Sequence, residues 1–214
     1  MPQRRRYRRR KAMPPPQPSY LDKASQALAV AYAVRKLVNV EYKQVRRTLN
    51  ADPNTSGAVI NLTNVAEGTG ENERNGEKIR AKHINVQGTV TLNSSATASR
   101  YRLCIVRDNN GSTTMPAITD LFESVTEFQE GKPKSGDPQS NSRFTVLFDK
   151  MYYVDTSNRQ KRINWSSSLD HHIFFTGAAS TDEGKGHIYQ FVASNESTND
   201  PVCNVVSSVK YIDN

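Results

Sequence analysis

From residue 41 to its carboxyl end, the chain is a series of short β-type runs that turn residues separate. Residues 82–92 show the alternation most clearly, because Ile84, Val86, Val90 and Leu92 share one face of the run. No helical pattern alternates with these runs, so a sheet of parallel βαβ units is not expected. The pattern predicts an all-β, antiparallel sandwich or barrel. The predicted strands span residues 41–48, 57–63, 82–92, 100–108, 143–154, 163–175 (one strand or two), 185–193 and 202–212.

The segments between these runs have their own signals. Asn109-Asn-Gly111 predicts a turn, and residues 115–128 hold apolar side chains at a spacing typical of a short helix or an ordered loop. Residues 131–142 are rich in Gly, Pro, Ser and Lys, which favours an exposed loop on the outer surface. Cys104 and Cys203 are far apart in the sequence, and we expect each to lie reduced in a strand as a small hydrophobic residue.

The amino end differs in composition from the rest of the chain. Residues 1–11 hold seven basic residues and no acidic one, in a chain whose formal net charge is +8. Residues 13–18 are proline-rich and predict a stiff spacer. Ser19 and Asp22 have the spacing of a capping box, ahead of an Ala-rich helix predicted over residues 21–38. The predicted organisation is a disordered basic arm and spacer over residues 1–18, a helix within 19–38, and a β domain over 39–214.

The concentrated run of arginine predicts binding to nucleic acid. Neutralising phosphates releases condensed counterions, and the planar guanidinium can hold a phosphate through two hydrogen bonds. The alternatives are a solvated tail and a nuclear localisation signal, and the second is compatible with nucleic-acid binding. The residues of the run are Arg4, Arg5, Arg6, Arg8, Arg9, Arg10 and Lys11. The predicted nucleic-acid-binding set also includes Lys36, Lys43, Arg46 and Arg47, for which the alternative is a solvated strand face.

The residues that catalysis would require do not occur in a recognisable arrangement. His171 and His172 are adjacent, so in a strand they point to opposite faces and cannot hold one ion together. His83 and His187 stand alone, and no phosphate-binding glycine loop occurs. We therefore expect no enzymatic activity, no metal site and no cofactor. The longest apolar run, residues 27–34, is shorter than the roughly 18 to 20 residues of a membrane span, so no membrane insertion is expected.

Several segments, taken in order after the arginine run, resemble a known family. They are Val40-Glu-Tyr-Lys43, Asn75-Gly-Glu-Lys-Ile79, Ile84-Asn-Val-Gln-Gly-Thr-Val90, Tyr101-Arg-Leu-Cys-Ile-Val-Arg-Asp108 and Arg143-Phe-Thr-Val-Leu-Phe-Asp-Lys150. The ordered set is similar to capsid proteins of small circular Rep-encoding single-stranded DNA viruses (circovirus-like viruses) and to related capsids of plant satellite viruses. Residues 21–38 are more like the satellite-type capsids, whose amino-terminal helices touch the packaged nucleic acid.

The resemblance implies a fold, a function and partners. The expected fold is an eight-stranded antiparallel jelly roll, with about sixty copies closing a T=1 icosahedral shell around a single-stranded genome. Single-stranded DNA is favoured over RNA as the cargo, and the satellite-type features leave RNA open. The expected partners are other copies of the chain, the genome, host nuclear import receptors and an unidentified host-cell receptor. The expected locations are the virion and, during assembly, the host nucleus.

The rival hypothesis is a non-enzymatic jelly-roll module that binds carbohydrate or nucleic acid without forming a shell. Tyr152, Tyr153 and Trp165 could form a stacking platform for a sugar, and the alternative is that they fill the core or a subunit contact. The arginine run has no role in a carbohydrate-binding module, so the capsid hypothesis explains more of the sequence.

Overall fold

The structure is a computed structural model that describes residues 23–30, 42–124, 126, 128, 131 and 143–213. The chain divides into two compact units, Met1–Val40 and Glu41–Asn214. In the first unit the described residues, 23–30, are helical, and they lie within the helix predicted over 21–38. The arginine run and Lys36 lie outside the described residues, and the predicted domain boundaries stay a prediction.

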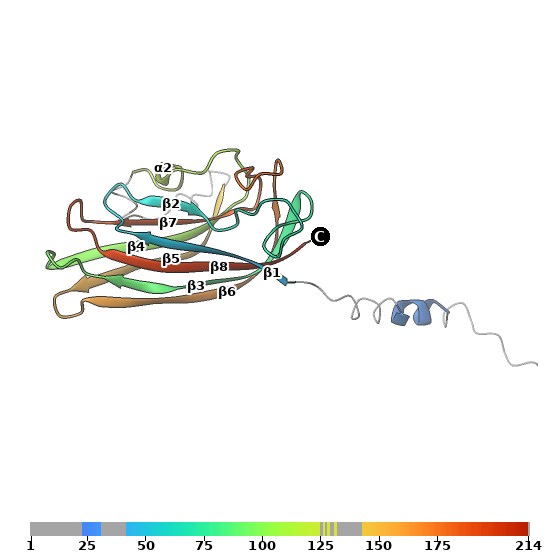
Figure 1. Cartoon of the computed structure of the whole chain (residues 1–214), viewed down its shortest axis with the longest axis horizontal. Coiled ribbons are helices and arrows are strands. Elements are labelled where there is room, and N and C mark those ends of the chain that lie inside the picture. The colour runs from blue at the N-terminus through green and yellow to red at the C-terminus, as the bar shows by residue number, and fades with distance from the viewer. Residues whose placement is uncertain are drawn as a thin grey trace, which may run out of the picture. The chain divides into compact units, whose positions relative to one another are not determined.

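The second unit is a sandwich of two four-stranded antiparallel sheets (Figure 1). Sheet A has the strand order β1-β8-β3-β6 and sheet B the order β2-β7-β4-β5. This arrangement confirms the predicted eight-stranded jelly roll. The elements are β1 (Tyr42–Ala51), β2 (Ala58–Asn61), β3 (Lys78–Thr91), β4 (Ala98–Asp108), α2 (Ile118–Leu121), β5 (Phe144–Asp155), β6 (Gln160–Phe174), β7 (Ile188–Ser194) and β8 (Val202–Asp213).

The structure defines most of the segments whose form the sequence left open. Residues 163–175 belong to one long strand, β6, and not to two. Within residues 115–128, Ile118–Leu121 form a helical turn, α2, and the described residues Thr126 and Phe128 are also helical. The predicted turn forms after β4, where the Asp108 carboxylate accepts hydrogen bonds from the backbone N–H groups of Asn110 (3.0 Å) and Gly111 (3.1 Å). Of residues 131–142, the structure describes only Gly131, so the predicted exposed loop lies outside the described residues.

Two apolar cores lie on the two sides of sheet B. The larger core fills the space between the sheets and includes Ile84, Val86, Val90 and Leu92, which confirms the shared face predicted for that strand. Cys203 lies in this core as a free thiol, and its burial raises its pKa to about 11. The smaller core lies on the other face of sheet B. Figure 1 shows α2 on this side of the sheet, away from sheet A.

The smaller core holds the segment after β4 against sheet B. Cys104, also a free thiol, and Phe191 of the sheet pack there with Phe122 and Phe128 of that segment, whose rings meet edge to face at 4.9 Å. The outer face of sheet B is therefore covered by apolar contacts. The equivalent face of sheet A has exposed and partly exposed side chains along its four described strands, so it is the open face of the sandwich.

A buried arginine fastens the covering segment to sheet B. Arg102 in β4 is only 7% exposed and forms two hydrogen bonds with the Asp149 carboxylate of β5, at 2.7 and 2.6 Å. Its third nitrogen donates to the carbonyls of Phe128 (2.6 Å) and Gly131 (2.8 Å), and its guanidinium lies 4.9 Å from the ring of Phe122. One side chain thus links two strands of the sheet with the segment that covers them.

We expect the substitution Arg102→Met to lower the free energy of unfolding by about 3 kcal/mol or more, because it leaves a carboxylate and two carbonyls without their donor. Thermal denaturation measures the loss, and the rate at which a thiol reagent labels Cys104 reports release of the covering segment. The matched control is Arg162→Met on the open face of sheet A, with an expected change within about 0.5 kcal/mol. Equal melting temperatures for the two variants would contradict this role for Arg102.

A buried polar cluster joins β2 to β7. His187 Nε2 donates to the carbonyl of Phe174 (3.0 Å), which leaves Nδ1 as an acceptor facing Asn61 Nδ2 (3.0 Å) and Thr63 Oγ1 (3.1 Å). The neighbouring carboxylate of Glu183 accepts from Asn61 (2.8 Å) and from the hydroxyl of Tyr189 (2.6 Å). Burial is the main cause that lowers the pKa of His187, to about 4 from its ordinary 6.5.

This cluster predicts a loss of stability in mild acid. Between pH 6.5 and about 4 the unfolded chain takes up a proton on His187 that the folded chain does not, so the free energy of unfolding falls as the pH falls through this window. The loss of stability due to this residue is on the order of 3 kcal/mol once the pH reaches about 4, and above pH 6.5 there is no loss. Urea denaturation between pH 4 and 8 should show a flatter profile for His187→Gln. The exposed His172→Gln is the control, and a profile unchanged by His187→Gln would refute the assignment.

In the part of the chain that the structure describes, no helix combines the length and the apolar composition that a membrane crossing needs. Within the same residues, no group of three or more His, Cys, Asp or Glu side chains is placed to hold a metal ion.

Candidate nucleic-acid interface

The three basic residues of β1 that were predicted to bind nucleic acid do not lie on the same face of the strand. Successive side chains of a strand point to opposite faces, so Lys43 and Arg47 share one side with the core residue Val45, whereas Arg46 lies on the other. The sequence placed all three in one predicted nucleic-acid-binding set. The structure separates them into two structural cations and one exposed cation.

Lys43 and Arg47 are engaged within the fold. The Lys43 ammonium lies 2.8 Å from a carboxylate oxygen of Asp213 and donates to the carbonyl of Glu73 (2.8 Å), with only 9% of the residue exposed. Arg47 donates to the carbonyl of Asn64. Both side chains attach β1 to the segment between β2 and β3. Phosphate binding by these two residues stays a prediction, and the burial of Lys43 argues against it.

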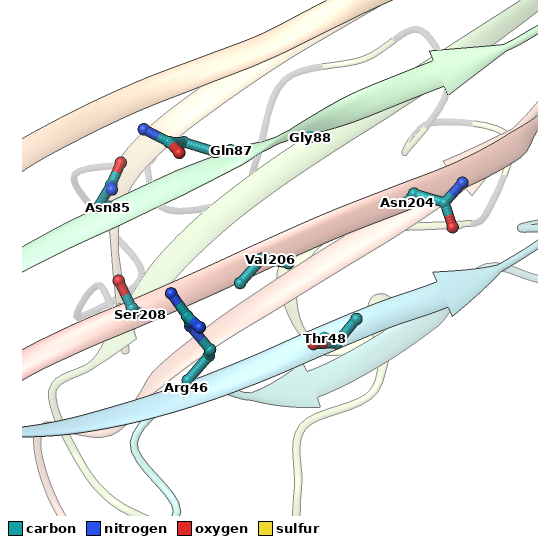
Figure 2. Close-up of a pocket in the computed structure, with 8 residues that line it drawn as sticks. All are labelled: Arg46, Thr48, Asn85, Gln87, Gly88, Asn204, Val206 and Ser208. Atoms are coloured by element: carbon teal, nitrogen blue, oxygen red, sulfur yellow. The ribbon is translucent and has the colours of Figure 1, made fainter.

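Arg46 points away from the core, onto the open face of sheet A. It lines a trough of about 400 Å³ that crosses three strands, β1, β8 and β3 (Figure 2). Strand register explains the arrangement, because Arg46 lies opposite Ser208 and Ser208 lies opposite Asn85. The neighbouring row pairs Thr48 with Val206 and Val206 with Gln87. Figure 2 shows these side chains standing on the sheet, and the remaining lining residues are Gly88 and Asn204.

The trough is floored mainly by amides and hydroxyls. Asparagine and glutamine each offer two donors and one acceptor oxygen, so they can hydrogen-bond to sugar, phosphate or base edges. Asn164 on β6 extends the row, since it lies opposite Gln87. Gly88 keeps two strands close together, because a Cβ at this position would lie 2.2 Å from the carbonyl oxygen of Asn204.

The open face of sheet A is also basic. On the side of the four strands that faces away from the core, the described residues include six basic side chains and one acidic side chain, Asp170. The six basic residues are Arg46, Lys78, Arg80, Lys82, Arg162 and Lys210. A surface of this composition attracts a polyanion.

Two of the six basic residues are neutralised by the one acid. Arg80 and Lys82 each hydrogen-bond to the Asp170 carboxylate, at 2.7 and 2.6 Å, and these bonds, with that of Arg80 first, hold the pKa of Asp170 at about 2. Among the described residues, no ion pair involves the other four. Arg46, Arg162 and Lys210 therefore remain as the exposed charges around the amide-rich trough.

The aromatic residues considered for a sugar platform do not assemble into one. Tyr152 faces the core and is 7% exposed, while its neighbour Tyr153 points to the opposite side and is 58% exposed. Trp165 packs against Phe148 of the other sheet, with ring centroids 4.8 Å apart. Two of the three aromatic rings therefore pack within the sandwich, and no shared stacking surface exists.

The amide-rich row was missed in the sequence, although a signal for it was present. Asn85, Gln87 and Asn204 each alternate with buried residues along their own strands, which identifies them as outward-facing. The sequence does not show that the outward faces of β1, β8 and β3 are adjacent. That adjacency follows from the jelly-roll strand order, which joins segments more than 100 residues apart.

We expect the substitutions Lys43→Met and Arg46→Met to separate these roles. Lys43→Met should lower the free energy of unfolding by about 1 to 3 kcal/mol, because it leaves the partly buried carbonyl of Glu73 without a donor and Asp213 without its counter-charge. Arg46→Met should change it by less than about 0.5 kcal/mol. Chemical denaturation of the two variants in parallel measures the difference, and an equal or larger loss for Arg46→Met would show that Arg46 is also structural.

Two solved structures show a weak likeness to this chain. The chain aligns with latent PorU from Porphyromonas gingivalis with a TM-score of 0.37 and 5% identity, over 81% of this chain and 13% of that one. It aligns with a structure of infectious bursal disease virus, Gx strain, with a TM-score of 0.28 and 7% identity, over 80% of this chain and 32% of that one. Neither likeness carries an argument about fold or function.

Sequence comparisons are more informative. The family model for the satellite tobacco necrosis virus coat protein matches residues 21–214. The coat protein of Satellite tobacco necrosis virus 2 is 30% identical over 201 residues, which cover 89% of this chain and 96% of that protein. These matches support the satellite-virus side of the predicted resemblance and give no support to the circovirus-like side.

Proposed function

Because the chain belongs to the satellite tobacco necrosis virus coat protein family, we propose that it is a capsid protein that encloses single-stranded nucleic acid. Copies of the jelly roll associate through their edges and loops into a small icosahedral shell. The shell contains about sixty copies in T=1 symmetry, in keeping with closed point-group assemblies of one repeated chain. The family match over residues 21–214 is the observation on which this proposal rests.

The open face of sheet A is the proposed inner surface of the domain. Its side chains are basic, amide-bearing or hydroxyl-bearing, whereas the outer face of sheet B is covered by the smaller apolar core. Arg46, Arg162 and Lys210 supply the exposed charge on this face. Contacts of this kind hold phosphate without reading sequence, which suits a protein that must enclose a whole genome.

The arginine run supplies most of the proposed packaging energy. Arg4 to Arg10 and Lys11 would neutralise phosphates in every copy, and many arms on one shell make individually weak contacts strong in combination. The same run has the composition of a nuclear localisation signal, so nuclear import before assembly is a secondary proposal. Attachment of the particle to an unidentified host-cell receptor remains part of the proposal.

For the cargo we now place RNA ahead of DNA. The preference for DNA came from the resemblance to circular-DNA virus capsids, which the family match does not support. The satellite-type features of residues 21–38 had left RNA open. Both nucleic acids therefore enter the test.

The test combines electron microscopy with salt-dependent binding of single-stranded RNA and DNA to the full-length protein. We expect uniform small shells, and a slope of log affinity against log salt of about −0.7 for each phosphate neutralised, so about −5 for the seven charges of one arm. Replacing Arg4, Arg5, Arg6, Arg8, Arg9 and Arg10 by Ala should remove most of this slope. The double variant Arg46→Gln/Lys210→Gln should make the slope about 1.4 less negative than that of the natural chain.

The matched control is Lys150→Gln/Arg159→Gln, which removes two exposed charges outside the open face of sheet A. This control should bind as the natural chain does. If no shells form at any salt concentration or pH, the rival hypothesis of a binding module without a shell holds. If both double variants lose the same slope, the open face of sheet A has no special role.

A further inference from the structure

A second cleft lies at the end of the sandwich where β4 and β6 finish. Its volume is about 420 Å³, which is within the usual range for sites that bind a small ligand. Its lining includes Arg107 and Asn109 at the end of β4, His171, His172 and Phe174 on β6, and Lys185 from the segment before β7. Four of these six side chains are cationic or can become so, and none of the described residues that line the cleft is a carboxylate.

One of the two permanent cations of the cleft, Arg107, is oriented by uncharged partners. Arg107 donates to the side-chain oxygen of Asn109 (2.9 Å) and to the hydroxyl of Thr145 (3.4 Å), so its guanidinium is positioned without being neutralised. Lys185 is exposed, and within the described residues neither cation forms an ion pair. Two cations without counter-charges, one of them held in place by hydrogen bonds, favour an anionic ligand.

One histidine of the cleft is held in a fixed position beside these cations. The ring of His171 is fixed by a hydrogen bond from Nε2 to the carbonyl of Gly186 (3.1 Å). Its pKa is lowered mainly by burial, with the charge of Arg107 and the neighbouring His172 acting in the same direction, while Gly186 and Asp170 oppose them. The carboxylate of Asp170 is already engaged by Arg80 and Lys82. The cleft therefore holds positive charge that its own acidic neighbour does not neutralise.

An exposed aromatic ring stands beside the cations. Phe174 is 43% exposed, and its ring lies 6.2 Å from that of His172 at an angle of 47°. Aromatic rings beside basic side chains are the usual means of holding unpaired bases, because every base has a face that can stack. In the register of sheet A, Phe174 lies opposite Lys78, so the ring adjoins the open face of sheet A.

We propose that this cleft binds one nucleotide, with its phosphate against Arg107 and Lys185 and its base stacked on Phe174. The proposal rests on the proposed function to this extent: the nucleotide would belong to the packaged strand where that strand leaves the open face of sheet A. A free nucleoside monophosphate presents the same phosphate and base. It therefore serves as the probe.

The experiment is photo-crosslinking of 8-azidoadenosine 5′-monophosphate to the full-length protein, with the labelled peptides identified by mass spectrometry. We expect label within residues 171–186, and competition by adenosine monophosphate at concentrations about tenfold lower than by adenosine or by inorganic phosphate. Lys185→Gln and Phe174→Leu should each weaken labelling about tenfold. Both side chains are exposed, so neither substitution is expected to unfold the domain.

The controls separate this proposal from the packaging proposal. Lys150→Gln should label as the natural chain does. Arg46→Gln/Lys210→Gln should lose affinity for a single strand and keep monophosphate labelling of the cleft. Label confined to residues 4–11, or undiminished label in both Lys185→Gln and Phe174→Leu, would overturn the proposal. Cleft labelling that a single strand does not compete away would support a site for free nucleotides, and would remove only its link to packaging.

Discussion

The apolar layer between sheet B and the segment after β4 decides which face of the sandwich is available to a polyanion. Phe122 and Phe128 pack with Cys104 and Phe191, so apolar side chains cover the outer face of sheet B there. Arg102 holds the cover in place through Asp149 and two backbone carbonyls. Sheet A has amides, hydroxyls and basic residues on its outward face instead. The outer face of sheet B lies under the smaller apolar core and the outer face of sheet A is open and polar, and this asymmetry underlies the proposed orientation in the shell.

The location of a cation, and not its charge alone, distinguishes structural from functional residues in this chain. Arg74 is fully buried, donates to the carbonyls of Val65, Gly76 and Gly177, and lies 4.1 Å from the ring of Phe175. The donors of such a cation are already hydrogen-bonded to backbone carbonyls, and its burial keeps it from contacting a phosphate. Arg46 and Lys185 are exposed and lack such a set of acceptors. Net charge per segment, which drew attention to the amino end, does not make this distinction.

The alternation of apolar residues made the strands predictable. The basic face of sheet A was not predictable, because it depends on pairing between strands far apart in the sequence. The alternation of Ile84, Val86 and Val90 identified β3 and its buried face, and both cysteines were expected in strands and found there. The same period of two could have separated Arg46 from Lys43, because residues three apart in a strand face opposite ways. No local pattern could have shown that Lys43 meets Asp213, a partner 170 positions later whose place depends on the β1–β8 pairing.

The separation of packing from cargo contacts has a consequence for how such a chain can change. The residues of sheet A that are proposed to touch nucleic acid stand on its exposed face, where substitutions alter stability by less than about 0.5 kcal/mol. The residues that fix the fold, such as Arg102 and Glu183, are buried and satisfied by several partners each. If sheet A binds the genome as proposed, its affinity can be adjusted there without disturbing the jelly roll. Folding and the proposed packaging then depend on different residues of one domain.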